Sequence, residues 1–361
     1  MKERLRFLDT GLLVPMLVLV LMGTLTVYSA GRGTIQSGLW LKQSLWDLLG
    51  FLLLAGVAAV NPLRTFRGAF PLYVLGILSL VAVLVAGHQI GGARRWLVLG
   101  GLTWQPSELM KWLALLFVSH RLGTRPPMDV RGKELAGAAA LVCFPMLLVL
   151  KQPDLGMAIS FLPILLLIPL LKGLKVKWVA IGLVAGSLFG VFAWRQVLKP
   201  YQKQRVLTFL DPGADLQGKG YQINQSRIAI GAGGVFGQGF TSGSQTQLNF
   251  LPVKTTDFVF SVWAEERGFL GVMLALGLFG AVITRILDTA RLAKTAAETY
   301  FCVGAAGIIG LHLLVNVGMV AGALPNKGMV LPFFSAGGSS TLSFFLALGM
   351  IMGILHRARV K

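Results

Sequence analysis

The chain has 361 residues, of which 55% are hydrophobic and 13% are charged, and it carries a formal net charge of +19. A soluble domain has roughly twice that share of charged residues, so the composition excludes an ordinary soluble globular protein. The basic residues are dispersed among short segments between apolar runs. This dispersal excludes a nucleic-acid-binding module and suits contact with the anionic headgroups of a membrane.

The apolar residues gather into runs that, with their flanks, approach the roughly 20 residues a helix needs to cross a hydrocarbon core. These runs are 12–28, 48–60, 70–86, 108–118, 136–150, 159–171, 179–193, 269–286, 303–320 and 344–355. They predict an all-α polytopic membrane protein of about ten transmembrane helices, in one domain over residues 1–361. The first run follows Lys2, Arg4 and Arg6, but no small-residue cleavage site ends it, so we expect a retained span rather than a secretory signal.

Lysine and arginine are divided unequally between the two sides of these predicted spans. The termini and the connections on their side hold roughly three times as many basic residues as the opposite short connections. Because basic residues favour the cytoplasmic side of a membrane, we expect both termini in the cytoplasm.

The segment Gln-Pro-Ser-Glu-Leu-Met-Lys at 105–111 opens a predicted span. We expect Ser107 to cap the helix, with Pro106 fixing the direction of the chain. Glu108 and Lys111 are three residues apart and share one face of the helix. Since ionisable groups near a membrane are usually paired or functional, the two form either a structural ion pair or a pair that lines a polar cavity, where Lys111 meets a phosphate.

The segment Lys-Gln-Pro-Asp-Leu-Gly at 151–156 has a similar pattern. Asp154 is predicted either to cap the next helix or to lie at the outer edge as a carboxylate available to a substrate sugar or a cation.

A long stretch from about 195 to 257 breaks the alternation of span and short loop. It mixes glycine and polar residues with aromatic and aliphatic ones, which predicts short amphipathic helices at the outer face of the membrane. Its excess of basic residues favours either an anionic amphiphilic partner, such as a lipid-linked phosphate, or ordinary headgroup contact. The glycine-rich run at 231–239 lacks the residues of a nucleotide loop, so we expect it to form turns with positive φ or a close backbone approach.

The end of this stretch leads at 249–260 into a span that carries Glu265 and Glu266. Asp257 is therefore predicted at the boundary of water and membrane, either as a helix cap or as a general base whose pKa is adjusted by its surroundings. The segments 316–325 and 331–340 flank the last external connection and are rich in glycine and proline. They indicate either unwound backbone that lines a cavity or tight packing of helices through small residues.

Taken together and in order, these motifs resemble the SEDS family (shape, elongation, division and sporulation). The matching segments are Gly-Ala-Arg-Arg-Trp-Leu at 92–97, Gln-Pro-Ser-Glu at 105–108, Gln-Pro-Asp-Leu-Gly at 152–156, Ile-Ala-Ile-Gly-Ala-Gly-Gly at 228–234, Phe-Leu-Pro at 250–252, Thr-Asp-Phe at 256–258, Ala-Glu-Glu-Arg-Gly at 264–268 and Leu-Pro-Phe-Phe-Ser-Ala-Gly-Gly-Ser-Ser at 331–340. The resemblance implies a peptidoglycan glycosyltransferase that polymerises lipid II on the outer face of the bacterial cytoplasmic membrane. Gln152 and the short N-terminal tail favour the elongation branch of the family over the division branch.

The resemblance also assigns residues and partners. It places the essential acid of the family on Asp257 and the cavity-lining positions on Arg95, Glu108, Lys111 and Asp154. It implies a class B penicillin-binding protein and other membrane proteins of the elongation complex as partners. The chain departs from the family where a Glu and a His are usual, because Val253 and Thr255 stand there. A mechanism that needs those two side chains therefore does not apply to this chain.

These assignments give a reaction hypothesis. Asp257 accepts a proton from an attacking sugar hydroxyl, while Lys111, Arg95 and the basic residues of the outer loop stabilise the departing diphosphate. A divalent cation, Mg²⁺ or Mn²⁺, held by Asp or Glu could assist, although the sequence has no Cys/His cluster that would indicate zinc. Two alternatives remain open: a lipid II flippase, for which a polytopic chain with charges facing a cavity is also typical, and a non-catalytic scaffold of the synthase complex.

Overall fold

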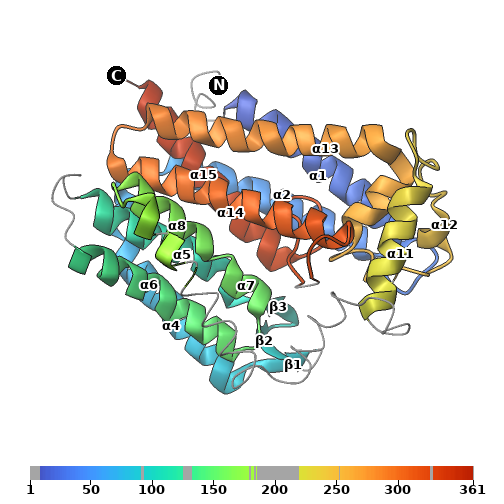
Figure 1. Cartoon of the computed structure of the whole chain (residues 1–361), viewed down its shortest axis with the longest axis horizontal. Coiled ribbons are helices and arrows are strands. Elements are labelled where there is room, and N and C mark those ends of the chain that lie inside the picture. Colours follow the sequence, from blue (N-terminus) through green and yellow to red (C-terminus); the bar gives the residue numbers. More distant parts are fainter. Residues whose placement is uncertain are drawn as a thin grey trace.

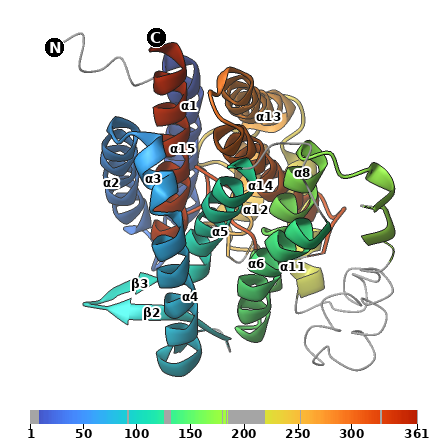
Figure 2. The same ribbon diagram turned by 90° about the vertical axis from the view of Figure 1, so that its left-hand side faces the viewer.

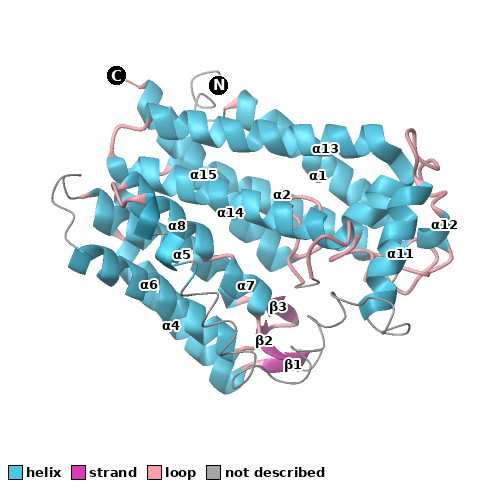
Figure 3. Cartoon of the chain, in the orientation of Figure 1, coloured by secondary structure: helices cyan, strands magenta, loops and turns pink. Residues whose placement is uncertain are grey.

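The computed structural model describes residues 9–90, 93–124, 132–178, 180–182, 184, 219–251, 253–325 and 328–360. Within these ranges the chain is a helical bundle with one small sheet (Figures 1 and 3). The helices are α1 (Thr10–Gly31), α2 (Leu39–Ala59), α3 (Pro62–Arg67), α4 (Ala69–Ala86), α5 (Pro106–Gly123), α6 (Gly132–Lys151), α7 (Leu155–Ile159), α8 (Leu162–Leu171), α11 (Lys219–Ala232), α12 (Ser244–Gln247), α13 (Val259–Leu292), α14 (Ala296–Val320) and α15 (Gly338–Arg359). The strands are β1 (His88–Ile90), β2 (Ala93–Leu99) and β3 (Leu102–Trp104), paired antiparallel in that order.

Seven of the described helices are long and apolar enough to cross a membrane, namely α1, α2, α4, α6, α13, α14 and α15. A further apolar stretch, Leu155–Leu171, holds α7 and α8 and is shorter than a full crossing. The prediction of an α-helical polytopic membrane protein is thus confirmed. The count of about ten spans stays a prediction, since most of the run at 179–193 lies outside the described residues.

The two ends of the bundle differ (Figures 1 and 2). The end of α15 and the connection from α13 to α14 lie at one end of the long axis, whereas the sheet, α11 and α12 lie towards the other (Figure 1). At the first end, Asp9 caps α1 by accepting a hydrogen bond from the Leu12 amide at 3.0 Å. The same carboxylate pairs with Arg285 at 2.7 Å and Arg359 at 2.6 Å, so one acid joins the start of α1 to α13 and α15.

The glycine-rich run lies against a break in α13. Gly234, Gly237 and Gly239 have φ values of 52°, 86° and 99°, as the sequence predicts. Gly268 interrupts α13 with φ 64°, and a Cβ there would lie 2.4 Å from the Gly237 amide nitrogen. Only glycine fits this backbone-to-backbone contact, which holds the outer loop against α13.

The long stretch predicted at 195–257 is described from residue 219 onwards, and 195–218 lie outside the described residues. Its described part contains the two short helices α11 and α12, as expected. Ile223 and Ala229 of α11 are buried, whereas Ile228 is half exposed, so the helix packs one apolar side inward. It contacts α13 and α14.

Two predictions of helix caps have different outcomes. Asp154 caps α7, since its side chain accepts a hydrogen bond from the Met157 amide at 3.2 Å. The prediction for Ser107 is wrong, because α5 begins at Pro106 with Gln105 in the N-cap position. The Gln105 amide donates to the Ser339 hydroxyl at 3.0 Å, so a residue of α15 satisfies one of the amides at the start of α5.

Candidate functional site

A polar cavity of about 690 Å³ lies where the sheet, the start of α5 and the segments before α13 and α15 meet. Four of the five residues that the sequence singled out line it: Arg95, Glu108, Asp154 and Asp257. The other lining residues are Lys42, Leu45, Trp46, Leu49, Trp96, Gly101, Thr103, Gln105, Met157, Thr256, Gly328, Val330, Ala336, Gly337, Gly338, Ser339 and Ser340. The backbone of 328–337 is irregular, and Ala336 and Gly337 of this stretch line the cavity, which confirms the prediction of unwound backbone for the segment 331–340. The segment 316–325, which lies within the described residues, does not line the cavity, and its first residues belong to α14.

Arg95 projects from β2 and is held by the connection between α6 and α7. Its Nε donates to the Gln152 carbonyl at 3.3 Å, and its Nη2 donates to the Pro153 carbonyl. Its Nη1 lies 3.5 Å from Asp154 Oδ2. These contacts fix the direction of the guanidinium, and the side chain is 23% exposed and lines the cavity.

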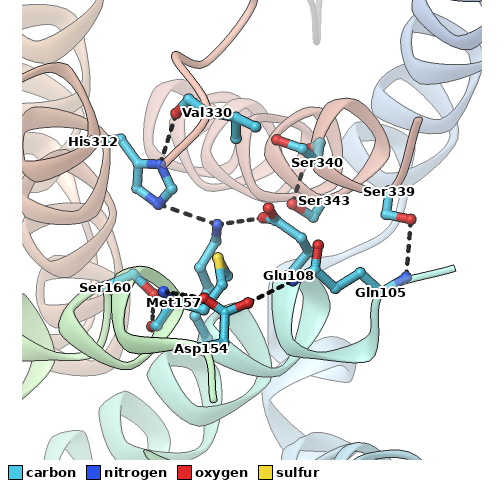
Figure 4. A network of polar contacts seen from close by, with 11 residues as sticks. Gln105, Glu108, Asp154, Met157, Ser160, His312, Val330, Ser339, Ser340 and Ser343 are labelled. Atoms are coloured by element: carbon cyan, nitrogen blue, oxygen red, sulfur yellow. Dashed lines mark hydrogen bonds and ion pairs between the residues drawn. The ribbon is translucent and has the colours of Figure 1, made fainter. Parts of the chain in front are cut away.

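Asp154 caps a helix and also lines the cavity, so the two roles predicted for this residue are compatible. Oδ1 accepts from the Met157 amide, and Oδ2 accepts from Gln105 Nε2 at 3.0 Å (Figure 4). These bonds use both oxygens to fix the carboxylate, which is 4% exposed and pairs with Arg95.

Glu108 and Lys111 form the predicted ion pair, with Lys111 Nζ 2.6 Å from Glu108 Oε2. Glu108 lines the cavity, but Lys111 is completely buried and is not among the lining residues. Its ammonium also lies 3.3 Å from His312 Nε2 and 4.4 Å from the centroid of the Phe344 ring. In this structure Lys111 therefore lies behind Glu108, so the expected contact with a phosphate is not formed from this position.

Asp257 lies in the turn before α13 and lines the same cavity. It is not the cap of α13, because Phe258 occupies that position. Asn316 Nδ2 donates to the Asp257 carbonyl at 3.1 Å, which fixes the main chain that carries the acid. The Asp257 carboxylate faces Gly328, where an added Cβ would lie 3.6 Å from Oδ2.

Val253 and Thr255, which replace the Glu and His usual in the family, differ in burial and contacts. Thr255 is buried, donates from Oγ1 to Gln36 Oε1 at 3.0 Å, and accepts the Ala336 amide through its carbonyl at 3.0 Å. Val253 is half exposed. Lys254 donates to the Thr246 carbonyl at 2.6 Å, and burial lowers its pKa against the opposing charge of Glu265. Lys254 thus supports the outer loop rather than supplying a cation to the cavity.

Five ionisable residues line the cavity: the basic residues Lys42 and Arg95, and the acidic residues Glu108, Asp154 and Asp257. Across the described ranges there is no group of three or more His, Cys, Asp or Glu residues arranged to hold a metal. A divalent cation would therefore be held by one or two carboxylates together with substrate phosphates, which is the usual mode for Mg²⁺. The acids of the cavity fit that mode.

Sequence reasoning missed polar residues that hold the wall of the cavity. Gln43 of α2 accepts the Gly337 amide at 2.9 Å and donates to Thr341 at 3.0 Å, and Asn316 and His312 of α14 support the segment 328–330. Their partners are mostly distant in sequence and lie largely in the loops and turns before α13 and α15, so no local pattern marks these residues. For Asn316, the motif at 316–325, which begins with this residue, was the one feature of the sequence that pointed to it.

A second cavity of about 370 Å³ is almost entirely apolar. It is lined by Val57, Val60, Thr65, Leu72, Leu75, Gly76, Ser79, Trp104, Pro106, Leu109, Trp112, Leu113, Leu116, Phe301, Leu346 and Met350. Trp104 and Pro106 line this cavity, whereas Gln105 between them lines the polar one. The polar and apolar cavities are therefore neighbours on either side of the start of α5.

Comparisons with known proteins agree with one another. The family model for FtsW, RodA and SpoVE, described as cell cycle protein, matches residues 4–360. The chain is 37% identical over 352 residues to the peptidoglycan glycosyltransferase MrdB of Escherichia coli, covering 97% of this chain and 94% of MrdB. It matches a solved chain from a peptidoglycan synthase complex that coordinates polymerization and crosslinking, with 36% identity, a TM-score of 0.84 and coverage of 98% and 99%.

The crystal structure of the rod-shape-determining protein RodA of Thermus thermophilus is also similar, with 32% identity, a TM-score of 0.73 and coverage of 98% of each chain. Sequence and structure thus match over nearly the whole length of this chain and of its relatives. The chain belongs to the FtsW, RodA and SpoVE family of cell cycle proteins, the family that its motifs resemble.

Proposed function

We infer that this membrane protein is a peptidoglycan glycosyltransferase. The observation that carries this conclusion is the polar cavity, which Asp257, Glu108, Asp154 and Arg95 line together next to an apolar cavity, within the fold of this family. A substrate with a charged sugar-diphosphate head and a long apolar tail needs both kinds of surface side by side. The proposed substrate is lipid II, the lipid-linked disaccharide.

The proposed reaction forms one glycosidic bond and breaks one bond to phosphate. The 4-hydroxyl oxygen of one sugar attacks the anomeric carbon of a second lipid-linked disaccharide, and the bond from that carbon to the phosphate oxygen breaks. The bonding electrons leave with undecaprenyl diphosphate, and the proton of the attacking hydroxyl passes to Asp257. Proton transfer to a positioned carboxylate typically contributes about 10²–10⁴-fold to a rate.

The negative charge that develops on the leaving diphosphate needs positive charge nearby. We assign this role to Arg95, whose guanidinium is fixed by two carbonyls and by Asp154, and to Lys42, which also lines the cavity. Lys111 acts indirectly, because its buried ammonium fixes the position of Glu108. Glu108 and Asp154 are then positioned to hold sugar hydroxyls or to share a cation with the diphosphate.

A bound divalent cation would supply additional positive charge at the diphosphate. Glu108 and Asp154 are the carboxylates that we expect to hold it, in combination with the phosphate oxygens, while Asp257 accepts the proton. The proton transfer and the roles of Arg95 and Lys111 do not depend on this cation.

The apolar cavity is the proposed seat of the first isoprene units of the lipid. Its wall of Leu72, Leu75, Leu109 and Leu113 offers an apolar surface to the methyl-branched isoprene units, and Gln105 separates it from the polar cavity. This placement implies that the headgroup enters the polar cavity from the side of the bilayer.

We also propose an orientation and a partner. Described members of the richer set, among them Arg285, Arg357 and Arg359, lie at the end of the bundle where α15 ends, so we assign both termini to the cytoplasm and the cavity to the outer face. Because the similar solved chain belongs to a complex that also crosslinks, we propose that a class B penicillin-binding protein crosslinks the glycan that this chain makes.

The test is incubation of the purified chain with lipid II in detergent, with and without Mg²⁺ or Mn²⁺, followed by sizing of the products on a gel. We expect glycan polymer, and we expect none from Asp257→Asn. Transport across a membrane cannot occur in detergent, so polymer would exclude a pure flippase. A scaffold predicts no polymer from the wild-type chain alone or with its partner.

A further inference from the structure

Helix α14 places two buried polar side chains, one helical turn apart, behind the polar cavity. His312 and Asn316 are both 0% exposed. They are four residues apart and so lie on the same face of α14. Buried polar groups in an apolar bundle are costly unless they form hydrogen bonds, so their bonds indicate what they do.

His312 bridges the segment before α15 and the ion pair of α5. Its Nδ1 lies 3.0 Å from the Val330 carbonyl, and Val330 lines the cavity (Figure 4). A carbonyl only accepts, so Nδ1 carries the proton, and in the neutral ring Nε2 is left as an acceptor. Lys111 Nζ lies 3.3 Å from Nε2 and donates to it, while the same ammonium donates to Glu108. The imidazole therefore links Val330 to Glu108 through Lys111.

Asn316 bonds to the main chain of two segments that line the cavity. Its Nδ2 donates to the Asp257 carbonyl at 3.1 Å and to the Met329 carbonyl at 2.9 Å. Both amide hydrogens are thus used on main-chain oxygens, one beside the proposed base and one beside Val330. Its Oδ1 is buried with no hydrogen-bond partner among the described residues, so the residue is kept at the cost of one unsatisfied acceptor.

We propose that His312 and Asn316 are positioning residues, which fix the main chain of Asp257 and of 329–330 relative to the Glu108–Lys111 pair. Neither side chain lines the cavity, so they act through the groups that do. The base and the carboxylate of Glu108 come from segments far apart in sequence, and α14 is the element that bonds to both sides. This inference rests on the proposed function, because the spacing matters only when a sugar is held between these groups.

A pure packing role makes a different prediction from a positioning role. The His312 ring packs edge-on against Phe344, with centroids 5.1 Å apart. His312→Phe keeps an aromatic ring at this position and removes both hydrogen bonds. His312→Asn retains a group near the place of Nδ1, and His312→Gln retains one near the place of Nε2. The matched control is Leu314→Ala on the same helix, since Leu314 is 63% exposed.

The experiment measures lipid II polymerisation by purified full-length variants, together with the melting temperature of each in detergent. We expect His312→Phe and Asn316→Leu to lower kcat about 10²-fold, the size of effect that a displacement of about 1 Å produces, with a much smaller change in KM. His312→Asn and His312→Gln should lie between His312→Phe and the wild type. Leu314→Ala should retain the kcat of the wild type.

Three results would overturn the proposal. The first is His312→Phe with the kcat of the wild type, which would leave the ring as packing alone. If His312→Phe does not fold, the second is wild-type kcat in both His312→Asn and His312→Gln. The third is Asn316→Leu that folds and polymerises at the wild-type rate. A wild-type chain that makes no polymer would instead refute the proposed function, so the two failures are distinguishable.

Discussion

The ion pair of Glu108 and Lys111 gives a sharp prediction, because its lysine is completely buried. The Lys111 side chain is 0% exposed and that of Glu108 is 4% exposed, with 2.6 Å between the charged atoms. Glu108→Gln leaves the ammonium without its paired charge, and breaking a buried pair in this way costs about 3–5 kcal/mol. We expect a value near the lower limit, since glutamine still accepts a hydrogen bond and His312 remains in contact.

The double variant Glu108→Gln/Lys111→Met removes both charges and should recover most of this loss, because no unpaired charge is left. The assay is a cycle of melting temperatures in detergent for the wild type, both single variants and the double variant. The matched control is the pair of Asp288 and Arg291 on α13, which has the same spacing of three residues and 3.2 Å between the charged atoms. Its side chains are 47% and 81% exposed, so Asp288→Asn should cost less than about 1 kcal/mol.

The reasoning is refuted if Glu108→Gln is as stable as Asp288→Asn, or if the effects of the two buried substitutions simply add. Either result would mean that Lys111 is neutral or reaches water in the folded protein.

The remaining predictions concern the two ends of the bundle. Hydrogen bonding to Arg285, against desolvation by burial and with help from Arg359, lowers the pKa of Asp9 from 3.8 to about 2. This contribution to stability is present above pH 4 and is lost as the pH falls towards 2. Over this range the free energy of unfolding of the wild type should therefore fall by about 1–2 kcal/mol more than that of Asp9→Asn, which lacks the carboxylate. Melting curves of both proteins against pH measure this difference. At the other end, Gly237→Ala should destabilise the outer loop by more than about 1 kcal/mol, because φ is 86° and its Cβ would lie 2.2 Å from the Glu266 carbonyl. Gly231→Ala is its control, since nothing lies within 4 Å of a Cβ there, and equal melting temperatures for the two variants would contradict the argument.

Local features of the site could be predicted from the sequence because they depend on spacing along one helix or turn. The shared face of Glu108 and Lys111, the cap formed by Asp154 and the positive φ values of the glycine-rich run are of this kind. Ser107 was predicted wrongly because Gln105 occupies the N-cap position, and its amide donates to Ser339, which is distant in sequence and close only in the fold.

Contacts between helices could not be predicted in the same way. Lys111 has the same sequence spacing from Glu108 whether it faces the cavity or lies behind the acid, and the choice is made by packing against His312 and Phe344. Gln43 gave no local signal, since its bond to Gly337 joins residues that are 294 positions apart. The seven described spans were clear from hydropathy, whereas the full number of spans stays a prediction.

The substitution of Thr255 for the histidine of the family bears on the mechanism. Thr255 supports the wall of the cavity through Gln36 and the Ala336 amide, and neither bond requires an ionisable group. Asp257 is then the one acid in the segment 253–258, which concentrates the proposed proton transfer on a single side chain.

The central claim is tested most directly by the rate of lipid II polymerisation by purified Asp257→Asn beside the wild type, with both proteins shown to be folded by their melting temperatures. Asparagine is close in size but cannot accept the proton, so we expect the rate to fall by at least about 10²-fold while the melting temperature stays close to that of the wild type. Polymer formed by Asp257→Asn at the wild-type rate would contradict the account, since the attacking hydroxyl would then lose its proton to another group.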